Sequence, residues 1–90
     1  MVTESDVALW MVEEFIRSNG YLCQEDVVYK IRSRFGKKFV YINKNGNLAI
    51  SKKVLKEFKK LTEPRVVWVK SERCWRQRAR NDPKGRRQVD

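Results

Sequence analysis

The side chains best equipped to act on a ligand in this chain are cations. Residues 51–62 carry five lysines and one acid, Glu57. Farther along, Arg76 and Arg78 alternate in a short segment that also contains Trp75. Ammonium and guanidinium groups gathered in this way attract phosphates and other anions because their potentials add. These residue types therefore indicate electrostatic binding of a polyanion.

Residues suited to catalysis form no recognisable constellation. The chain has no histidine, and it lacks a GxSxG motif, a P-loop, a Rossmann fingerprint and paired carboxylates among its apolar segments. The stretch 45–47 (Asn-Gly-Asn) is typical of a turn and not of a phosphate cradle. We expect no enzymatic activity, no cofactor and no metal site.

Cys23 and Cys74 are the two cysteines of the chain. They lie far apart in the sequence without a CxxC partner, so we expect neither a disulfide nor a zinc site but two small core residues in a reducing cytoplasm. Residues 1–6 lack the basic start and apolar stretch of a secretion signal. No apolar run approaches the roughly 20 residues that span a bilayer. We therefore expect a cytoplasmic protein without a membrane partner.

Charge is distributed unevenly along the chain. The net charge is +10 and the sequence pI is about 10.0. Residues 1–29 hold six acids and one base, a net of −5, whereas residues 30–90 hold 20 bases and five acids, a net of +15. An imbalance of this size favours nucleic acid as a partner, beyond what solubility requires.

Three segments have the apolar periodicity of amphipathic helices. The first, residues 5–18, begins near Thr3, which offers an N-capping oxygen. The second covers residues 24–35 and has acids in its first turn. The third covers residues 51–62, and the hydroxyl of Ser51 is expected to cap it.

Two further pairs of segments predict β-structure. Residues 39–42 and 48–50 flank an Asn-Gly pair, so we expect a hairpin or an irregular turn between the second and third helices. Residues 66–69 and 74–78 are β-branched, aromatic or alternating and flank a polar turn at 70–73. They predict a two-stranded hairpin.

The pleat of this hairpin separates two kinds of side chain. Trp75 and Gln77 are expected on one face of the second strand, and Cys74, Arg76 and Arg78 on the other. Residues 80–90 show no apolar periodicity and are expected to form a basic, disordered tail. The chain is therefore expected to be one α+β domain over residues 1–79.

The order of three helices followed by a hairpin with a basic second strand resembles the winged helix-turn-helix class over residues 5–79. The stretches 45–50 and 67–78 are also similar to those of a family of small phage and prokaryotic proteins with no assigned activity. The resemblance implies a winged-helix-like fold in which residues 51–61 form the third helix and residues 66–78 the wing.

In winged helices the third helix typically enters the major groove, and the wing contacts the backbone or the minor groove. The resemblance therefore implies a nucleic-acid-binding protein, with double-stranded DNA favoured over RNA. The connection of 15 residues between Phe35 and Ser51 is longer than the roughly four residues of an ordinary helix-turn-helix, so a basic corner at residues 37–38 is expected to share in binding. The candidate nucleic-acid-binding residues are Lys37, Lys38, Lys52, Lys53, Lys56, Lys60, Arg73, Arg76 and Arg78.

Alternatives to duplex binding remain open. Trp68 and Trp75 can stack on unpaired bases, although tryptophans that alternate in a hairpin more often close a core. Winged-helix domains also serve as interaction modules, so binding to a host or regulatory protein is the second hypothesis. Lysine suits phosphate, whereas base reading favours Arg, Asn or Gln, so contacts of the third helix are expected to be weakly specific.

Overall fold

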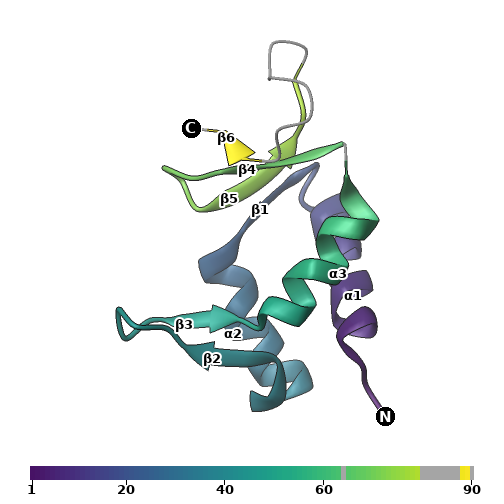
Figure 1. Cartoon of the computed structure of the whole chain (residues 1–90). Coiled ribbons are helices and arrows are strands. Elements are labelled where there is room, and N and C mark those ends of the chain that lie inside the picture. The colour runs from purple at the N-terminus through teal and green to yellow at the C-terminus, as the bar shows by residue number, and fades with distance from the viewer. Residues whose placement is uncertain (64, 80–87, 90) are drawn as a thin grey trace.

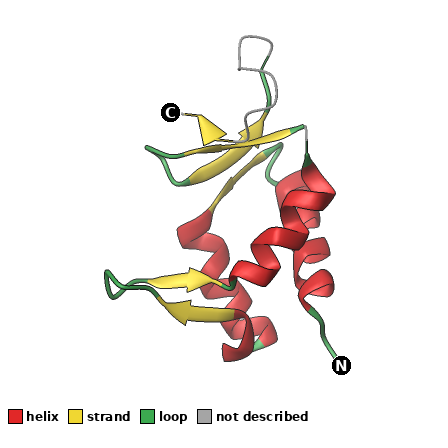
Figure 2. Ribbon diagram, viewed as in Figure 1, coloured by secondary structure: helices red, strands yellow, loops and turns green. Residues whose placement is uncertain are grey.

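The computed structural model describes residues 1–63, 65–79 and 88–89. Within them the chain forms an α+β fold, with three helices beneath a four-stranded sheet and a separate two-stranded hairpin to one side (Figure 1; Figure 2). The predicted α+β class and the three helices are confirmed. The helices are α1 (Glu4–Arg17), α2 (Gln24–Phe35), a short 3-10 helix η1 (Lys37–Phe39), and α3 (Lys52–Thr62).

α1 begins with a capping box. The Thr3 hydroxyl accepts a hydrogen bond from the Asp6 backbone N–H at 3.2 Å, and the Asp6 carboxylate accepts one from the Thr3 N–H at 2.9 Å. Two amides that the helix itself leaves unpaired are satisfied in this way. The helix ends where Asn19 (φ 59°) and Gly20 (φ 82°) adopt left-handed backbone conformations and turn the chain into the sheet.

Strands distant in sequence build the larger sheet. β4 (Val66–Val69) and β5 (Cys74–Gln77) form the predicted C-terminal hairpin. β1 (Tyr21–Cys23) pairs antiparallel with the other edge of β5. The sequence predicted only an extended link at residues 21–23, because three residues are too few to show an alternating pattern.

β6 (Gln88–Val89) pairs parallel with β4 and completes the strand order β1-β5-β4-β6. The expectation of a disordered basic tail covers residues 80–90, and of these residues 80–87 and 90 lie outside the described part of the chain.

The connection between α2 and α3 contains a second hairpin, as expected. β2 (Val40–Ile42) pairs antiparallel with β3 (Leu48–Ile50). The Asn43 side chain accepts hydrogen bonds at 3.0 Å from two backbone N–H groups of the turn. Gly46 has φ 81°, a conformation that glycine adopts at little cost.

The start of α3 differs from the prediction in one detail. Ser51 occupies the N-cap position, but its hydroxyl makes no capping hydrogen bond. Its backbone N–H donates to the Phe39 carbonyl at 2.8 Å, and its carbonyl accepts from the Leu55 N–H at 3.1 Å. The backbone contact with η1, rather than a side-chain cap, therefore fixes the backbone of Ser51.

The core lies where α1 and α3 pack together beneath the sheet. Phe58 of α3 is fully buried and meets the Trp75 ring edge to face, with centroids 5.1 Å apart. Burial of a side chain of this size stabilises the fold by about 2–3 kcal/mol. The core cluster comprises Val7, Ala8, Met11, Phe15, Leu22, Val27, Val28, Ile31, Phe39, Ile50, Val54, Phe58, Val66 and Trp75.

The interpretation of the two cysteines as unlinked core residues was wrong. Cys23 lies opposite Cys74 in the β1–β5 pair, and a disulfide joins them. Their separation of 51 positions conceals this proximity, because the pairing of β1 with β5 has no local sequence signal. The disulfide also removes the basis for inferring a reducing compartment from these residues.

Candidate functional site

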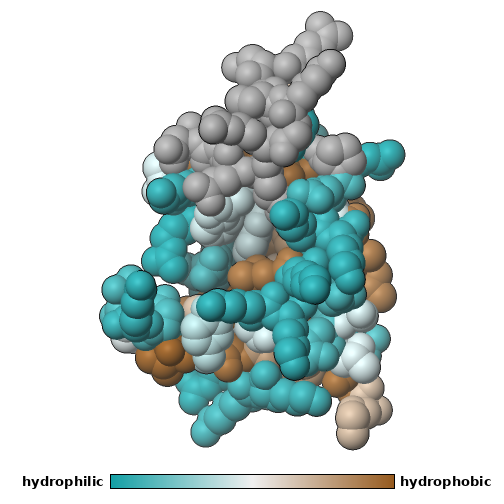
Figure 3. Space-filling model, in the orientation of Figure 1, coloured by the Kyte–Doolittle hydropathy of each residue, from teal (hydrophilic) through white to brown (hydrophobic). Residues whose placement is uncertain are grey.

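Ammonium groups cover the exposed side of α3. Val54 and Phe58 point into the core and are fully buried. Because successive helical residues are rotated by about 100°, the lysines occupy the opposite face and both of its edges. Hydrophilic side chains are visible over this helix (Figure 3). The structure brings together four predicted residues and adds Lys59: the exposed set is Lys52, Lys53, Lys56, Lys59 and Lys60.

Two acidic residues lie beside this surface but do not neutralise its positive charge. The Lys60 ammonium is 3.2 Å from the Glu57 carboxylate, and the Lys59 ammonium is 3.7 Å from that of Glu63. The hydrogen bond from Lys60, followed by one from Ser5, lowers the pKa of Glu57. Both lysine side chains remain more than half exposed, at 63% and 55%, so these ion pairs are weak and leave the cations accessible to an anion.

η1 brings the predicted basic corner next to the start of α3. Lys38 borders a pocket of about 580 Å³ together with Lys53 of α3 and Glu4 of α1. The Lys38 ammonium also lies 5.7 Å from the centroid of the Phe39 ring, within cation–π range. Lys37 is exposed on the same short helix. The corner at residues 37–38 is thus continuous with the lysine surface of α3.

The turn of the β4–β5 hairpin is tied to neighbouring elements. The Arg73 guanidinium lies 3.9 Å from the Glu25 carboxylate at the start of α2. The Tyr21 hydroxyl donates a hydrogen bond at 3.0 Å to Glu72, and this bond raises the pKa of Tyr21. Arg73 also has a left-handed backbone, with φ 56°. These contacts hold Arg73 beside α2 rather than beside α3.

The other two candidate arginines of the β4–β5 hairpin, Arg76 and Arg78, lie on the sheet face that points away from α3. The register pairs Trp68 with Trp75, and Trp75 packs against α3. Side chains alternate along a strand, so Arg76 and the following Arg78 point to the opposite face. Arg76 donates a hydrogen bond at 2.9 Å to the Gln77 carbonyl. The predicted cations therefore form two surfaces, one on α3 with the adjoining corner at residues 37–38 and one on the β4–β5 hairpin.

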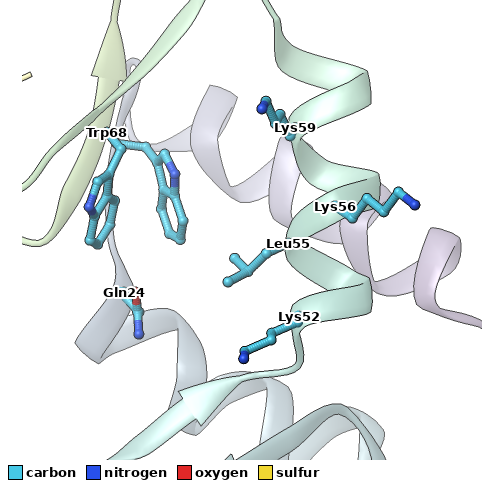
Figure 4. A pocket seen from close by; sticks show the side chains of 7 residues that line it. Gln24, Lys52, Leu55, Lys56, Lys59 and Trp68 are labelled. Carbon is cyan, nitrogen blue, oxygen red and sulfur yellow. The ribbon is translucent and has the colours of Figure 1, made fainter. Parts of the chain in front are cut away.

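An open groove of about 590 Å³ separates α3 from the β4–β5 hairpin. The Trp68 and Trp75 rings form one wall, with centroids 4.7 Å apart and planes inclined by 52°. Leu55, Lys52 and Lys59 point from α3 toward this groove, whereas Lys56 points away from it (Figure 4). The lining residues are Gln24, Lys52, Leu55, Lys56, Lys59, Trp68 and Trp75.

The groove contains residues that the sequence-based site did not include. Lys52, Leu55 and Lys59 are spaced by three and four positions, which places them on one edge of a helix. That spacing was a usable signal for Lys59. Gln24 had none, because it reaches the groove only through the pairing of β1 with β5.

In the described part of the chain, no cluster of three or more His, Cys, Asp or Glu side chains has a geometry that could hold a metal ion. No helix among those residues has the length and apolar character needed to cross a membrane.

The segment that carries these surfaces has relatives. Residues 3–77 match the family described as Family of unknown function (DUF6953). The chain belongs to this family. No curated protein and no solved structure matches the chain. The DUF6953 match extends from the capping residue Thr3 to the end of β5, so it includes the groove, the α3 surface and every candidate residue except Arg78.

Proposed function

We propose that this protein is a winged-helix-like domain that binds double-stranded DNA with little sequence preference. The main support is the surface of α3. Five exposed lysines cover the side of this helix that faces solvent, and its other side is buried in the core. A rigid helix holds these charges in a fixed array, so a polyanion meets them without ordering a loop first. The β4–β5 hairpin following α3 corresponds to the wing.

The residue types on α3 favour phosphate contact over base reading. An ammonium group is a compact point charge that binds phosphate oxygens from many directions. Bidentate reading of guanine or adenine requires Arg, Asn or Gln, and α3 has none of these. Binding through α3 is therefore expected to tolerate many sequences and to depend steeply on salt.

The basic corner extends the same surface. Lys38 shares a pocket with Lys53 at the first turn of α3, so a phosphate backbone that follows α3 meets Lys37 and Lys38 next. Arg73, Arg76 and Arg78 add positive charge on the wing, away from the lysine face of α3. We assign the lysines the principal contact and the wing arginines a secondary one.

A titration of labelled duplex DNA at several salt concentrations tests this function. The logarithm of the association constant should fall linearly with the logarithm of salt concentration, by about 0.9 for each phosphate contacted. Replacing Lys56 and Lys60 by Gln should reduce that slope by about 2. The matched control replaces Arg17 and Lys30 by Gln. Both cations pair with Glu14 of α1, away from the lysine surface of α3, so this variant should leave the slope nearly unchanged. Equal effects of the two double variants would contradict an α3 interface.

A protein partner is the second candidate, supported by apolar side chains on the outer edge between α1 and α3. The Ser5 hydroxyl of α1 donates a hydrogen bond at 3.1 Å to the Glu57 carboxylate of α3. Leu9 lies one turn after Ser5 and is 50% exposed, and Leu61 lies one turn after Glu57 and is 49% exposed. Ile16 adds a further apolar side chain on α1, 68% exposed. Absence of duplex binding at low salt would favour this surface as the functional one.

A further inference from the structure

We propose that the groove between α3 and the β4–β5 hairpin binds single-stranded nucleic acid, holding an unpaired base against Trp68 and the adjoining phosphates against Lys52 and Lys59. This site differs from the proposed duplex contact in ligand and in position. The duplex contact is centred on Lys56 and Lys60 of the outer face of α3, whereas Lys52 and Lys59, at the margin of that lysine surface, lie on the edge of α3 that faces the sheet (Figure 4).

The walls of the groove match the two chemical parts of a nucleotide. Trp75 is 4% exposed and packs on Phe58, so it serves as a buried support. Trp68 leans on Trp75 at a centroid distance of 4.7 Å but is only half-buried, which leaves indole surface in the groove. Leu55 faces it from α3. Flat apolar walls of this kind accept a nucleobase, because every base has a π-face that stacks on an aromatic ring.

The cations at the rim explain why the ligand should be anionic. Lys52 and Lys59 point toward the aromatic wall (Figure 4), and the only ion pair of either among the described residues is the weak, exposed pair of Lys59 with Glu63. Their positions differ by seven residues, which is about 10 Å along the helix axis. Two ammonium groups that far apart suit two different phosphates of one strand better than the single phosphate of a free nucleotide.

The volume and shape of the groove agree with that ligand. A volume of about 590 Å³ lies within the range of sites that hold small organic molecules, so a single nucleotide fits. The groove is open to solvent, so a strand can enter and leave it. Gln24 at its edge supplies a carboxamide able to hydrogen-bond a base.

Binding of an oligothymidylate of about ten nucleotides to the full chain tests the inference, since sequence-tolerant stacking needs no particular base. Fluorescence anisotropy of the labelled strand is expected to give saturable binding at low salt. Trp68→Leu should weaken it about tenfold or more, and Trp68→Phe should weaken it less because a ring remains. Duplex affinity should change less than twofold in either variant. Unchanged strand binding in Trp68→Leu would overturn the inference.

The lysines provide a second, independent comparison. The double variant Lys52→Gln with Lys59→Gln should weaken strand binding more than Lys53→Gln with Lys60→Gln, although each removes two charges from α3. Equal losses would show that only net charge matters and would overturn the site. Thymidine monophosphate should compete poorly with the strand, whereas effective competition would identify a free nucleotide as the ligand and overturn the assignment to a strand.

The outcomes for the two ligands are separable. Duplex binding without strand binding would overturn this inference and leave the proposed function standing. Strand binding without duplex binding would support this inference and overturn the proposed function. Circular dichroism of each variant shows whether it folds, and if Trp68→Leu does not, the Trp68→Phe and lysine comparisons decide.

Discussion

A disulfide joins Cys23 to Cys74 across the β1–β5 pair. Cys23 ends β1 and immediately precedes α2, and Cys74 precedes Trp75 in the wall of the groove, so the bond fixes the start of α2 beside that wall. The linked residues are 51 positions apart, and a crosslink over such a loop restricts the unfolded chain strongly. The bond therefore belongs to the framework that holds the groove together.

Removing this bond should destabilise the protein. Reduction, or the double change Cys23→Ser with Cys74→Ser, is expected to lower the free energy of unfolding by about 2–4 kcal/mol. Urea denaturation followed by circular dichroism measures the change. The serine variant should be insensitive to reductant, whereas the parent should lose stability when reductant is added. A parent protein equally stable in both conditions would contradict a structural role for the bond.

Gly20 and Gly46 provide a comparison of backbone strain with side-chain crowding. Both have positive φ, 82° and 81°, so an alanine at either position is expected to cost about 1–2 kcal/mol. At Gly20 the added Cβ would lie 2.7 Å from the Gln77 amide nitrogen, whereas nothing lies within 4 Å at Gly46. Displacing Gln77 from its rotamer should make Gly20→Ala worse by about 1 kcal/mol.

The Gln77 contribution can be isolated by a double-mutant cycle. If crowding is the cause, Gly20→Ala in a Gln77→Ala background should cost about the same as Gly46→Ala in the parent, as measured by urea denaturation. An unchanged excess cost in that background would show that Gln77 is not the obstacle.

The pKa of Glu57 should depend on its lysine neighbour. Hydrogen bonds from Lys60 and then Ser5 lower it below the ordinary value of 4.5. Stability from this carboxylate is therefore present above pH 4.5 and lost as the pH falls through the lower, folded pKa. Lys60→Gln should raise the pKa of Glu57 in an NMR titration. Lys53→Gln removes the same charge from α3 without removing that bond, and an equal shift there would exclude the hydrogen bond as the cause.

The sequence predicted the helices well because their signals are local. α2 has the predicted bounds, α3 starts one residue later than predicted, and α1 is displaced by one residue toward the N-terminus at both of its ends. Each contains apolar positions at helical spacing, and Thr3 and Gly36 mark termini in the way their chemistry requires. The two hairpins were likewise predicted by turn residues between short apolar segments.

Non-local pairing accounts for what the sequence did not reveal. β1 is three residues long and becomes a strand only by pairing with β5, more than 50 positions away. The same pairing creates the Cys23–Cys74 bond and brings Gln24 to the groove. Because periodicity reports which face of an element is buried but not which element buries it, these features require the tertiary structure.

The two cationic surfaces should contribute unequally to duplex binding. Lys56 and Lys60 lie on the outer face of α3, whereas Arg76 and Arg78 lie on the sheet face that points away from α3. A duplex seated along α3 should therefore contact the lysines more fully. We expect Lys56→Gln with Lys60→Gln to weaken duplex binding by about tenfold at low salt, and Arg76→Gln with Arg78→Gln to weaken it less.

Charge-conserving variants of Arg76 and Arg78 separate general attraction from placed contacts. Arg76→Lys with Arg78→Lys keeps the Coulomb attraction but removes the planar fork that holds a phosphate in fixed geometry. If the arginines contribute only to the general field, this variant should bind duplex as the parent does. Two results together would make the β4–β5 hairpin the principal contact. Duplex affinity would fall more in Arg76→Gln with Arg78→Gln than in the α3 variant, and it would also fall in the Lys variant. Those results would move the proposed duplex site from α3 to the opposite face of the sheet.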